Sequence, residues 1–153
     1  GQANDRLFGD AGNDIIKGDG GNDSLFGGNG ADTLIGGANR DFLSGDSGND
    51  TLIGGQGGDD LKGGAGADVF VFASGSGQDK ILDFNPGEDS ITLQGLGFQT
   101  VAEVIDNSFD VRGNLILFLD ADGSDFSWST SNYVDLIGID KTDLHDGNIA
   151  LIS

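Results

Sequence analysis

The stretch that decides the fold is residues 27–53, which read GGNGADTLI, GGANRDFLS and GDSGNDTLI when divided every nine residues. Each unit begins with glycine, has aspartate at position 6 (Asp32, Asp41 and Asp50) and has leucine at position 8. The first half is rich in glycine, which adopts left-handed and strained turns that other residues avoid. In the second half, positions 7 to 9 are typical of a very short β-strand with one inward side chain. The stretch predicts turns alternating with short strands.

The same period extends over residues 1–71, and two of its columns are unbroken. Each unit is too short to bury apolar surface alone, so the units must stack. Because residues 1–8 lack position 1, we expect this chain to be cut from a longer protein. The position-6 column is Asp5, Asp14, Asp23, Asp32, Asp41, Asp50, Asp59 and Asp68, and the position-8 column is Leu7, Ile16, Leu25, Leu34, Leu43, Leu52, Leu61 and Phe70.

This pattern, Gly-Gly-x-Gly-x-Asp-x-apolar-x, resembles the calcium-binding nonapeptide of the RTX (repeats-in-toxin) family of exported bacterial proteins. The resemblance implies an all-β fold, a right-handed parallel β-roll with two units in each coil. It also implies Ca²⁺ between successive turns on each side of the roll. Residues 1–71 would then form about four coils.

Two units per coil sort the aspartates into two stacks, one running from Asp5 to Asp59 and the other from Asp14 to Asp68. Successive carboxylates would lie about 4.8 Å apart. Without a cation each pair repels by ~1 kcal/mol in water, and by more where the dielectric constant is lower. A hard divalent ion between the two carboxylates turns this repulsion into a net attraction. Ca²⁺ fits better than Mg²⁺, because Ca²⁺ takes six or more oxygen ligands in flexible geometry.

The resemblance further implies which oxygens hold each ion. Position-6 carboxylates come from two turns, position-1 and position-3 carbonyls from one turn, and position-2 and position-4 carbonyls from the next. The position-1 and position-3 residues expected to supply carbonyls are Gly9, Ala11, Gly18, Gly20, Gly27, Asn29, Gly36, Ala38, Gly45, Ser47, Gly54, Gln56, Gly63 and Ala65.

The repeat continues in a degenerate form over residues 74–92. Asp79 reaches position 6 after a two-residue insertion, and Asp89 does so after a further inserted residue, Asp83. Asp79 would extend the stack of Asp59, and Asp89 would extend that of Asp68. Neighbouring pairs within the stacks predict about six calcium ions, or about eight with these two extensions. We therefore expect a calcium-binding roll over residues 1–92.

Residues 93–153 are expected to form a small β-rich C-terminal cap. Strands are predicted at residues 114–119, 133–137 and 148–152, and a short helix at residues 98–105. Residues 67–72, 77–84 and 144–153 resemble the C-terminal region of serralysin-type proteins. In such proteins the end of the chain is similar to an uncleaved signal for type I secretion.

The composition excludes several classes of function. The formal net charge of −19 disfavours nucleic acid and anionic lipid as partners and favours metal cations. Cysteine is absent and His145 is the only histidine, so cysteine-ligated and multi-histidine metal sites are excluded. No apolar run is long enough to span a membrane. Residues 45–48 resemble a protease nucleophile loop, but they lie in register with the repeat, and we expect a module that is not an enzyme.

Two features leave alternatives open. Asp120, Asp122 and Asp125 resemble the start of an EF-hand loop, but position 12 is Ser131 instead of Glu and no helices flank the loop, which favours a hairpin turn. One outer face of the repeats is flat and almost uncharged, and it is either an ordinary sheet face or a docking surface. Its residues are Ile15, Lys17, Thr33, Ile35, Thr51, Ile53, Val69 and Val71.

The sequence as a whole predicts a secreted, extracellular calcium-binding module. It would fold when it meets Ca²⁺ outside the cell and would support the secretion and stability of a larger protein. Its partners would be calcium, an upstream catalytic or adhesive domain of the same chain, and the type I secretion machinery. The alternative is a polysaccharide- or surface-binding module like those of alginate epimerases and adhesins, with Trp128 and Tyr133 as candidates for a glycan platform.

Overall fold

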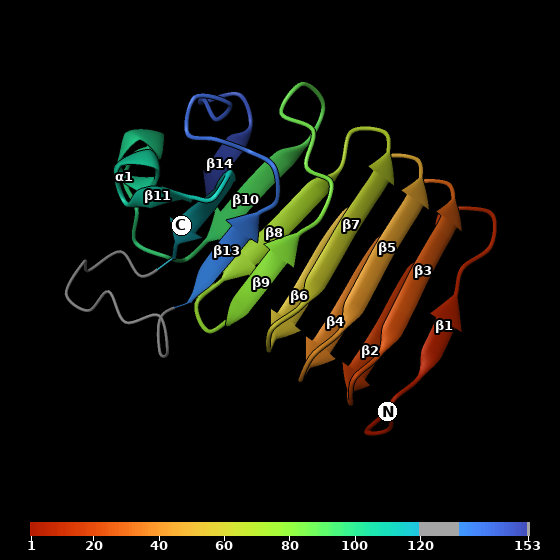
Figure 1. The fold of residues 1–153 in the computed structure, drawn as a ribbon. Helices are drawn as coiled ribbons and strands as arrows, with labels where there is room; N and C mark the ends of the chain where they lie inside the picture. The colour runs from red at the N-terminus through yellow and green to blue at the C-terminus, as the bar shows by residue number, and fades with distance from the viewer. Residues whose placement is uncertain (120–131, 153) are drawn as a thin grey trace.

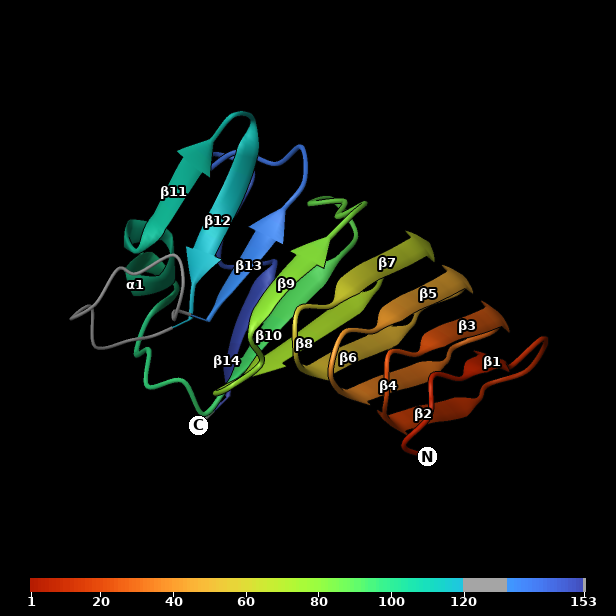
Figure 2. The same ribbon diagram turned by 60° about the horizontal axis from the view of Figure 1, so that its bottom comes forward.

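Two stacked β-sheets build most of this protein, and the strands from β1 to β10 alternate between them (Figures 1 and 2). The computed structural model describes residues 1–119 and 132–152. Sheet A has the order β1-β3-β5-β7-β9-β13-β12-β11, and sheet B has the order β14-β10-β8-β6-β4-β2. The strands of the roll are β1 Arg6–Phe8, β2 Ile15–Gly20, β3 Ser24–Asn29, β4 Thr33–Ala38, β5 Phe42–Ser47, β6 Thr51–Gln56, β7 Asp60–Ala65, β8 Val69–Ala73, β9 Gln78–Ile81 and β10 Ser90–Gln94.

Each coil of the roll uses two nine-residue units, as the resemblance implied. Parallel pairing places Leu7 beside Leu25 and Leu25 beside Leu43, so residues 18 apart in the sequence are neighbours. Beyond β7 the spacing grows to 20, because Leu61 pairs with Ile81. The prediction of an all-β parallel β-roll is confirmed.

The strands are longer than the sequence predicted. A regular strand such as β4 has six residues, positions 7 to 9 of one unit and positions 1 to 3 of the next. The glycine-rich positions belong to the strand because they pair with the next coil, as Gly37 does with Gly55. The prediction of strands limited to positions 7 to 9 was therefore wrong. Glycine pairs through its backbone and does not contribute to the apolar pattern from which the strands were predicted.

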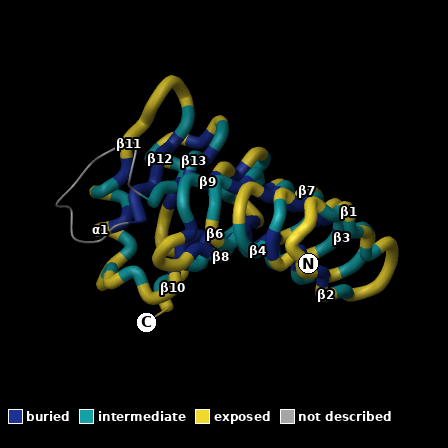
Figure 3. The backbone as a smooth tube through the Cα atoms, turned by 90° about the horizontal axis from the view of Figure 1, so that it is seen from below, coloured by how far each residue is buried: buried dark blue, intermediate teal, exposed yellow. Residues whose placement is uncertain are grey.

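The core of the roll is a column of position-8 side chains between the two sheets. Leu25, Leu34, Leu43, Leu52 and Leu61 are all 0% exposed. In Figure 3 buried and half-buried residues recur in each coil, and many residues of the turns are exposed. Side chains at positions 7 and 9 point outward, as predicted. With one large apolar side chain per unit, the core is thin, so other interactions must help to hold the coils together.

The C-terminal segment continues both sheets. β13 (Tyr133–Leu136) pairs with β9 in parallel, and β14 (Ile149–Ile152) pairs with β10 in parallel. β12 (Asn114–Phe118) runs antiparallel to both β13 and β11 (Ser108–Val111). The three predicted strands are present, whereas β11 was not foreseen. The division at residue 92 stays a prediction.

One short helix accompanies these strands. Helix α1 (Val101–Asp106) begins three residues later than predicted, because the side chain of Thr100 caps it by accepting a hydrogen bond from the Glu103 N–H. Val104 is its buried residue. Among the described residues, no helix has the length and apolar character needed to cross a membrane.

Candidate metal sites

The turns of the roll have an alternating backbone conformation. In each of the seven complete units, positions 2 and 4 have positive φ, for example Gly28 at 107° and Gly30 at 136°. Asp10, Asp19, Asp46 and Asn39 adopt the same left-handed conformation without being glycine. Asparagine and aspartate tolerate it better than other side chains, which explains why these residue types replace glycine in the turns.

The position-6 aspartates form the two predicted stacks, and one oxygen of each carboxylate links successive turns. The Asp14 N–H donates to Oδ1 of Asp32 at 2.8 Å, and the Asp32 N–H donates to Oδ1 of Asp50 at 2.8 Å. The same contact recurs along both stacks with distances of 2.7–3.0 Å, and it includes Asp79 and Asp89 at the ends. This contact fixes the orientation of each carboxylate.

The other carboxylate oxygen has no partner within the protein. Among the described residues, the buried side-chain oxygens without a hydrogen bond are one oxygen of Asp135 and Oδ2 of Asp14, Asp23, Asp32, Asp41, Asp50, Asp59, Asp68 and Asp79. A buried polar group without a partner requires an explanation, such as a bound ion. Its recurrence at eight equivalent positions makes this a property of the repeat.

The pKa values show how poorly the protein alone accommodates these charges. Burial raises the pKa of Asp59 and of Asp68 to about 6, and neighbouring carboxylates in the stack add to the shift. Burial likewise raises the pKa of Asp79 to about 8. A cation beside Oδ2 would reverse this effect, because an opposite charge at short range favours the ionised carboxylate.

A second oxygen lies beside five of the unpartnered Oδ2 atoms, those of Asp14, Asp23, Asp32, Asp41 and Asp50. If Gly27 had a Cβ, that atom would lie 2.5 Å from Oδ2 of Asp32 and 2.8 Å from the carbonyl oxygen of Gly45 in the next coil. Gly36 has the same surroundings, with Oδ2 of Asp41 and the Gly54 oxygen both at 2.5 Å. The cradle recurs at Gly9, Gly18 and Gly45. Its oxygens come from two adjacent coils, which suits a cation with oxygen ligands at about 2.3–2.6 Å.

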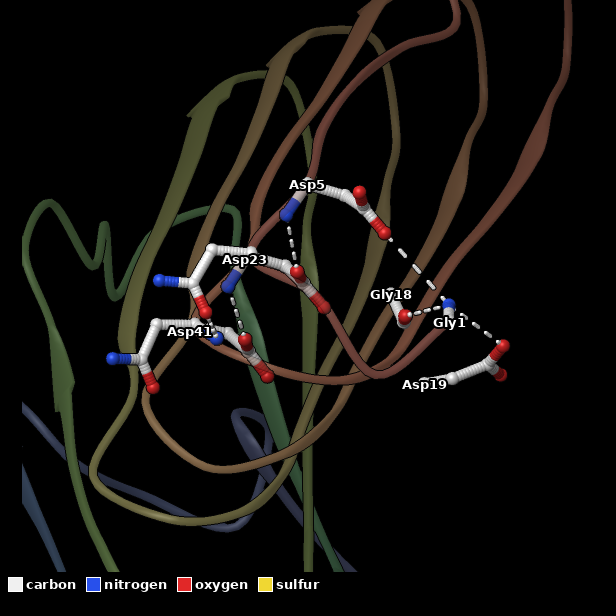
Figure 4. A network of polar contacts seen from close by, with 8 residues as sticks. Gly1, Asp5, Gly18, Asp19, Asp23 and Asp41 are labelled. Carbon is white, nitrogen blue, oxygen red and sulfur yellow. Dashed lines mark hydrogen bonds and ion pairs between the residues drawn. The ribbon is translucent and has the colours of Figure 1, made fainter.

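At the first coil, the backbone nitrogen of Gly1 lies beside these same two types of oxygen. This nitrogen donates to the Gly18 carbonyl oxygen at 2.9 Å, and it lies 3.8 Å from Oδ2 of Asp5 (Figure 4). It also contacts Oδ2 of Asp19 at 3.2 Å.

The predicted site residues do not all have the same surroundings. The position-1 carbonyls of Gly27, Gly36, Gly45, Gly54 and Gly63 lie at the cradles. The position-3 carbonyls of Asn29, Ser47 and Ala65 instead accept N–H groups of the preceding coil at 2.8–2.9 Å. Oδ2 of Asp89 differs from the rest of its stack because it accepts the Asn85 N–H at 2.8 Å. As calcium ligands, all of these residues remain predictions.

Sequence reasoning missed a second ladder at position 5. Side-chain oxygens of Asn4, Asn13, Asn22 and Asn49 each accept a backbone N–H from the next coil at 2.8–3.2 Å. The signal was present, because Asn precedes the position-6 Asp in half of the regular units. These amides tie successive turns together on their outer side.

The acidic loop with Asp120, Asp122 and Asp125 lies outside the described residues, as does Trp128.

Side-chain clusters alone would not reveal these sites. No group of three or more His, Cys, Asp or Glu side chains that could hold a metal occurs in residues 1–119 and 132–152. The repeat geometry explains this, because each cradle combines carboxylates with backbone carbonyls, and Ca²⁺ accepts both.

Comparisons with known proteins agree with this geometry. The family model for the RTX calcium-binding nonapeptide repeat (4 copies) matches residues 1–34, 35–70 and 44–81. A search of curated proteins found no match. The solution structure of the AlgE6R3 subunit of the mannuronan C5-epimerase of Azotobacter vinelandii has 31% identity and a TM-score of 0.60, covering 90% of this chain and 78% of that one.

Two further structures share the fold. The AlgE6R2 subunit of the same epimerase has 26% identity and a TM-score of 0.53, and the match covers 99% of this chain and 92% of that one. The extracellular lipase LipA of Serratia marcescens has 18% identity and a TM-score of 0.54, covering 97% of this chain and 38% of the lipase. The nonapeptide repeat is a structural, calcium-binding unit and not a catalytic one. The repeat in the sequence, the paired cradles and these matches together show that the chain belongs to the RTX calcium-binding nonapeptide repeat family.

Proposed function

We propose that this chain is a module of a larger secreted protein and that binding of Ca²⁺ drives its folding. The row of eight buried, unpartnered Oδ2 atoms carries the proposal. Each ion would lie between turns of adjacent coils, held by the position-6 carboxylates and by backbone carbonyls. When bound, Ca²⁺ supplies the positive charge that the stacked carboxylates lack.

The stacks define where the ions would bind. Six sites correspond to the neighbouring pairs of the regular units, three in each stack. Asp59 with Asp79 would hold a seventh ion, because Oδ2 of Asp79 is buried and has no partner. Asp68 with Asp89 would hold an eighth. The six regular pairs are Asp5–Asp23, Asp23–Asp41, Asp41–Asp59, Asp14–Asp32, Asp32–Asp50 and Asp50–Asp68.

The energetics favour folding only when the ion is present. Without it, like charges lie in register beside a core of one large apolar side chain per unit, which is little to offset chain entropy. Extracellular modules bind Ca²⁺ with dissociation constants of about 10⁻⁴–10⁻³ M, far above cytosolic calcium concentrations. An ion held at a hundred times its dissociation constant contributes about 2.7 kcal/mol to folding, and several such ions make the transition steep.

Circular dichroism of the chain tests this proposal directly. In EGTA we expect a spectrum dominated by disorder, and with millimolar Ca²⁺ a strand-rich spectrum that appears over a narrow concentration range. Mg²⁺ at the same concentration is the control and should produce little change, because it demands a tight octahedron. A strand-rich spectrum in EGTA, unchanged by calcium, would refute the proposal.

The proposed calcium-dependent folding also fits the export of this module as part of a larger protein. A chain that is unfolded at cytosolic calcium suits a secretion channel that passes unfolded polypeptides, and β14 would then be free to act as the type I signal. The partner in the same chain would be an upstream catalytic or adhesive domain. Deleting residues 148–153 should abolish export while calcium-induced folding of residues 1–71 persists. Continued export of the truncated chain would place the signal elsewhere.

One surface feature supports polysaccharide binding as a second candidate function. The outer side of sheet A carries an open groove of about 340 Å³ lined by Arg40, Gly58, Asp60, Gln78, Lys80 and Tyr133. Lys80 and Tyr133 lie together in this groove, where Arg40 is paired with Asp60 at 2.7 Å. A cation beside an aromatic ring suits an anionic sugar polymer. Calorimetry with polymannuronate, and with neutral dextran as the control, tests this. Binding that is unchanged in Lys80→Gln, or absent altogether, would exclude the groove.

A further inference from the structure

Asp83 occupies a special place at the end of the regular roll. It is the residue inserted between the degenerate repeats, and it lies two residues after Ile81, the end of β9. Its carboxylate spans two backbone groups of the preceding coil. Oδ1 accepts the Gly63 N–H at 2.9 Å, and Oδ2 accepts the Gly64 N–H at 3.0 Å.

In a regular turn the corresponding bond comes from backbone. The Gly9 N–H, for example, donates to the carbonyl oxygen of Phe26 in the next coil at 2.9 Å. At Gly63 the next strand has already ended, and the side chain of Asp83 takes over this role. A charged acceptor thereby replaces a neutral one at a similar distance, and hydrogen bonds to charged acceptors are stronger.

The peptide between Gly63 and Gly64 connects Asp83 to a cradle. Its N–H, which belongs to Gly64, points to Oδ2 of Asp83. Its carbonyl oxygen, which belongs to Gly63, lies 2.6 Å from where a Cβ on Gly45 would be, beside Oδ2 of Asp50. Because the peptide is planar and trans, these two groups point in opposite directions. A negative charge on one side thus faces the proposed ion position on the other side.

We infer that Asp83 is a positioning residue for the calcium ion between Asp50 and Asp68, acting through the Gly63–Gly64 peptide. Its carboxylate orients this peptide and polarises it, so that the Gly63 carbonyl oxygen becomes a stronger ligand. This resembles the way carboxylates support metal-bound histidines from the outer shell. The inference rests on the proposed function, because it needs a calcium ion at this cradle.

The surroundings of Asp83 also favour a role for its charge. Asp68 and Asp89 lie near enough for their carboxylates to be repelled by that of Asp83. A third carboxylate here is unfavourable in the protein alone, and a neutral acceptor would avoid that repulsion. A bound cation on the far side of the peptide offsets it.

The test compares Asp83→Asn with Glu88→Gln in the whole chain by NMR. Asp83→Asn keeps the shape of the side chain but loses the charge and one acceptor. Glu88→Gln is the matched control, because it removes one charge from the same loop, where Glu88 contacts the Asn85 side chain. The readouts are the amide shift of Gly64, the carbonyl carbon shift of Gly63 and calcium midpoints at two turns, residues 63–68 and residues 18–23.

We expect Asp83→Asn to raise the calcium midpoint of residues 63–68 by about tenfold, the lower end of typical outer-shell effects. The calcium-induced shift of the Gly63 carbonyl carbon should shrink, and the midpoint of residues 18–23 should stay within about twofold of wild type. Glu88→Gln should match wild type at both turns.

Three results would overturn the inference: equal midpoints for Asp83→Asn and wild type, an equal rise at both turns, or an equal effect of Glu88→Gln. If calcium does not change the NMR shifts of the wild-type chain, the proposed function itself would be refuted. The Gly64 amide shift in calcium-free protein at pH 4, compared between wild type and Asp83→Asn, then still reports the contact itself.

Discussion

At the scale of single residues, the stack aspartates from Asp23 to Asp79 have two separate tasks. Oδ1 accepts a backbone N–H from the preceding coil and so sets the register of the turn, as Asp50 does for Asp32. Oδ2 of the same residue is buried without a partner and faces the cradle. Asparagine could perform the first task but would not bring the charge needed for the second.

Position in the stack should therefore decide the effect of a mutation. Asp50 is shared by two proposed ion sites, whereas Asp5 touches one at the end of its stack. We expect Asp50→Ala to weaken calcium-dependent folding by about 3 kcal/mol, the contribution of two ions at roughly tenfold their dissociation constants. Asp5→Ala should cost about half as much. Calcium titrations followed by circular dichroism measure both midpoints, and equal shifts would contradict the shared-ligand geometry.

The glycine at position 1 gives an independent test of the cradle. An alanine at residue 27 would place its Cβ 2.5 Å from Oδ2 of Asp32 and 2.8 Å from the Gly45 oxygen. We expect Gly27→Ala to cost about 1–3 kcal/mol of calcium-dependent folding, as overpacking typically does. Gly87→Ala is the control, because the nearest atom to its Cβ would be the side-chain oxygen of Asn85 at 3.4 Å. Equal calcium midpoints for the two variants would count against the cradle.

Most of the roles of these single residues could be predicted from the sequence, and Asp83 is the exception. The unbroken aspartate column predicted both stacks, and it placed Asp79 and Asp89 at their ends despite the insertions. The role of Asp83 could not be predicted, because an inserted residue does not correspond to any position of the nine-residue repeat. Its contact with Gly63 depends on where β9 stops, which only the structure shows.

At the scale of secondary structure elements, the sequence predicted strands well where side chains alternate and less well elsewhere. β12, β13 and β14 were predicted within one residue at each end from their apolar runs. β11 was missed because Phe109 and Val111 are partly exposed, so its sequence shows no buried face. Its pairing with β12 depends on a tight turn, with Arg112 at φ 55° and Gly113 at φ 86°.

The turn stacks should make the calcium-free roll sensitive to pH. Burial raises the pKa of Asp59 and Asp68 to about 6 and that of Asp79 to about 8, above about 3.9 in an unfolded chain. The folded state thus binds these protons more tightly. Its resulting stability is fully present below about pH 4 and is lost as the pH rises through these values.

Calcium-stripped protein should accordingly show its strongest strand signal near pH 4 and lose it between about pH 4 and pH 8. With calcium the trend reverses, because protons compete with the ion, so the calcium midpoint should fall as the pH rises. Circular dichroism across this range measures both effects. A calcium-free strand signal that increases from pH 4 to pH 8 would show that the carboxylates are not buried as described.

At the scale of the whole molecule, two different sources of stability meet in one pair of continuous sheets. The coils from β1 to β8 combine a single file of apolar side chains with the charged stacks. The C-terminal segment instead buries an apolar cluster that includes Val104, Leu115, Leu117, Val134 and Leu136, each 0% exposed. Its antiparallel hairpin brings together residues close in sequence, which lowers the entropy cost of forming it.

The two parts should therefore respond differently to removal of calcium, and hydrogen exchange measured by mass spectrometry can resolve them. In EGTA we expect the amides of β3 to β7 to exchange at nearly the rate of an unfolded chain. Amides of β12 and β13 should keep measurable protection, because their cluster has no stacked carboxylates to repel one another. In millimolar calcium both groups should be protected. The comparison decides whether residues 93–153 are a separate unit: if β12 loses protection at the same calcium concentration as β5, the sheets unfold together and the division at residue 92 has no thermodynamic meaning.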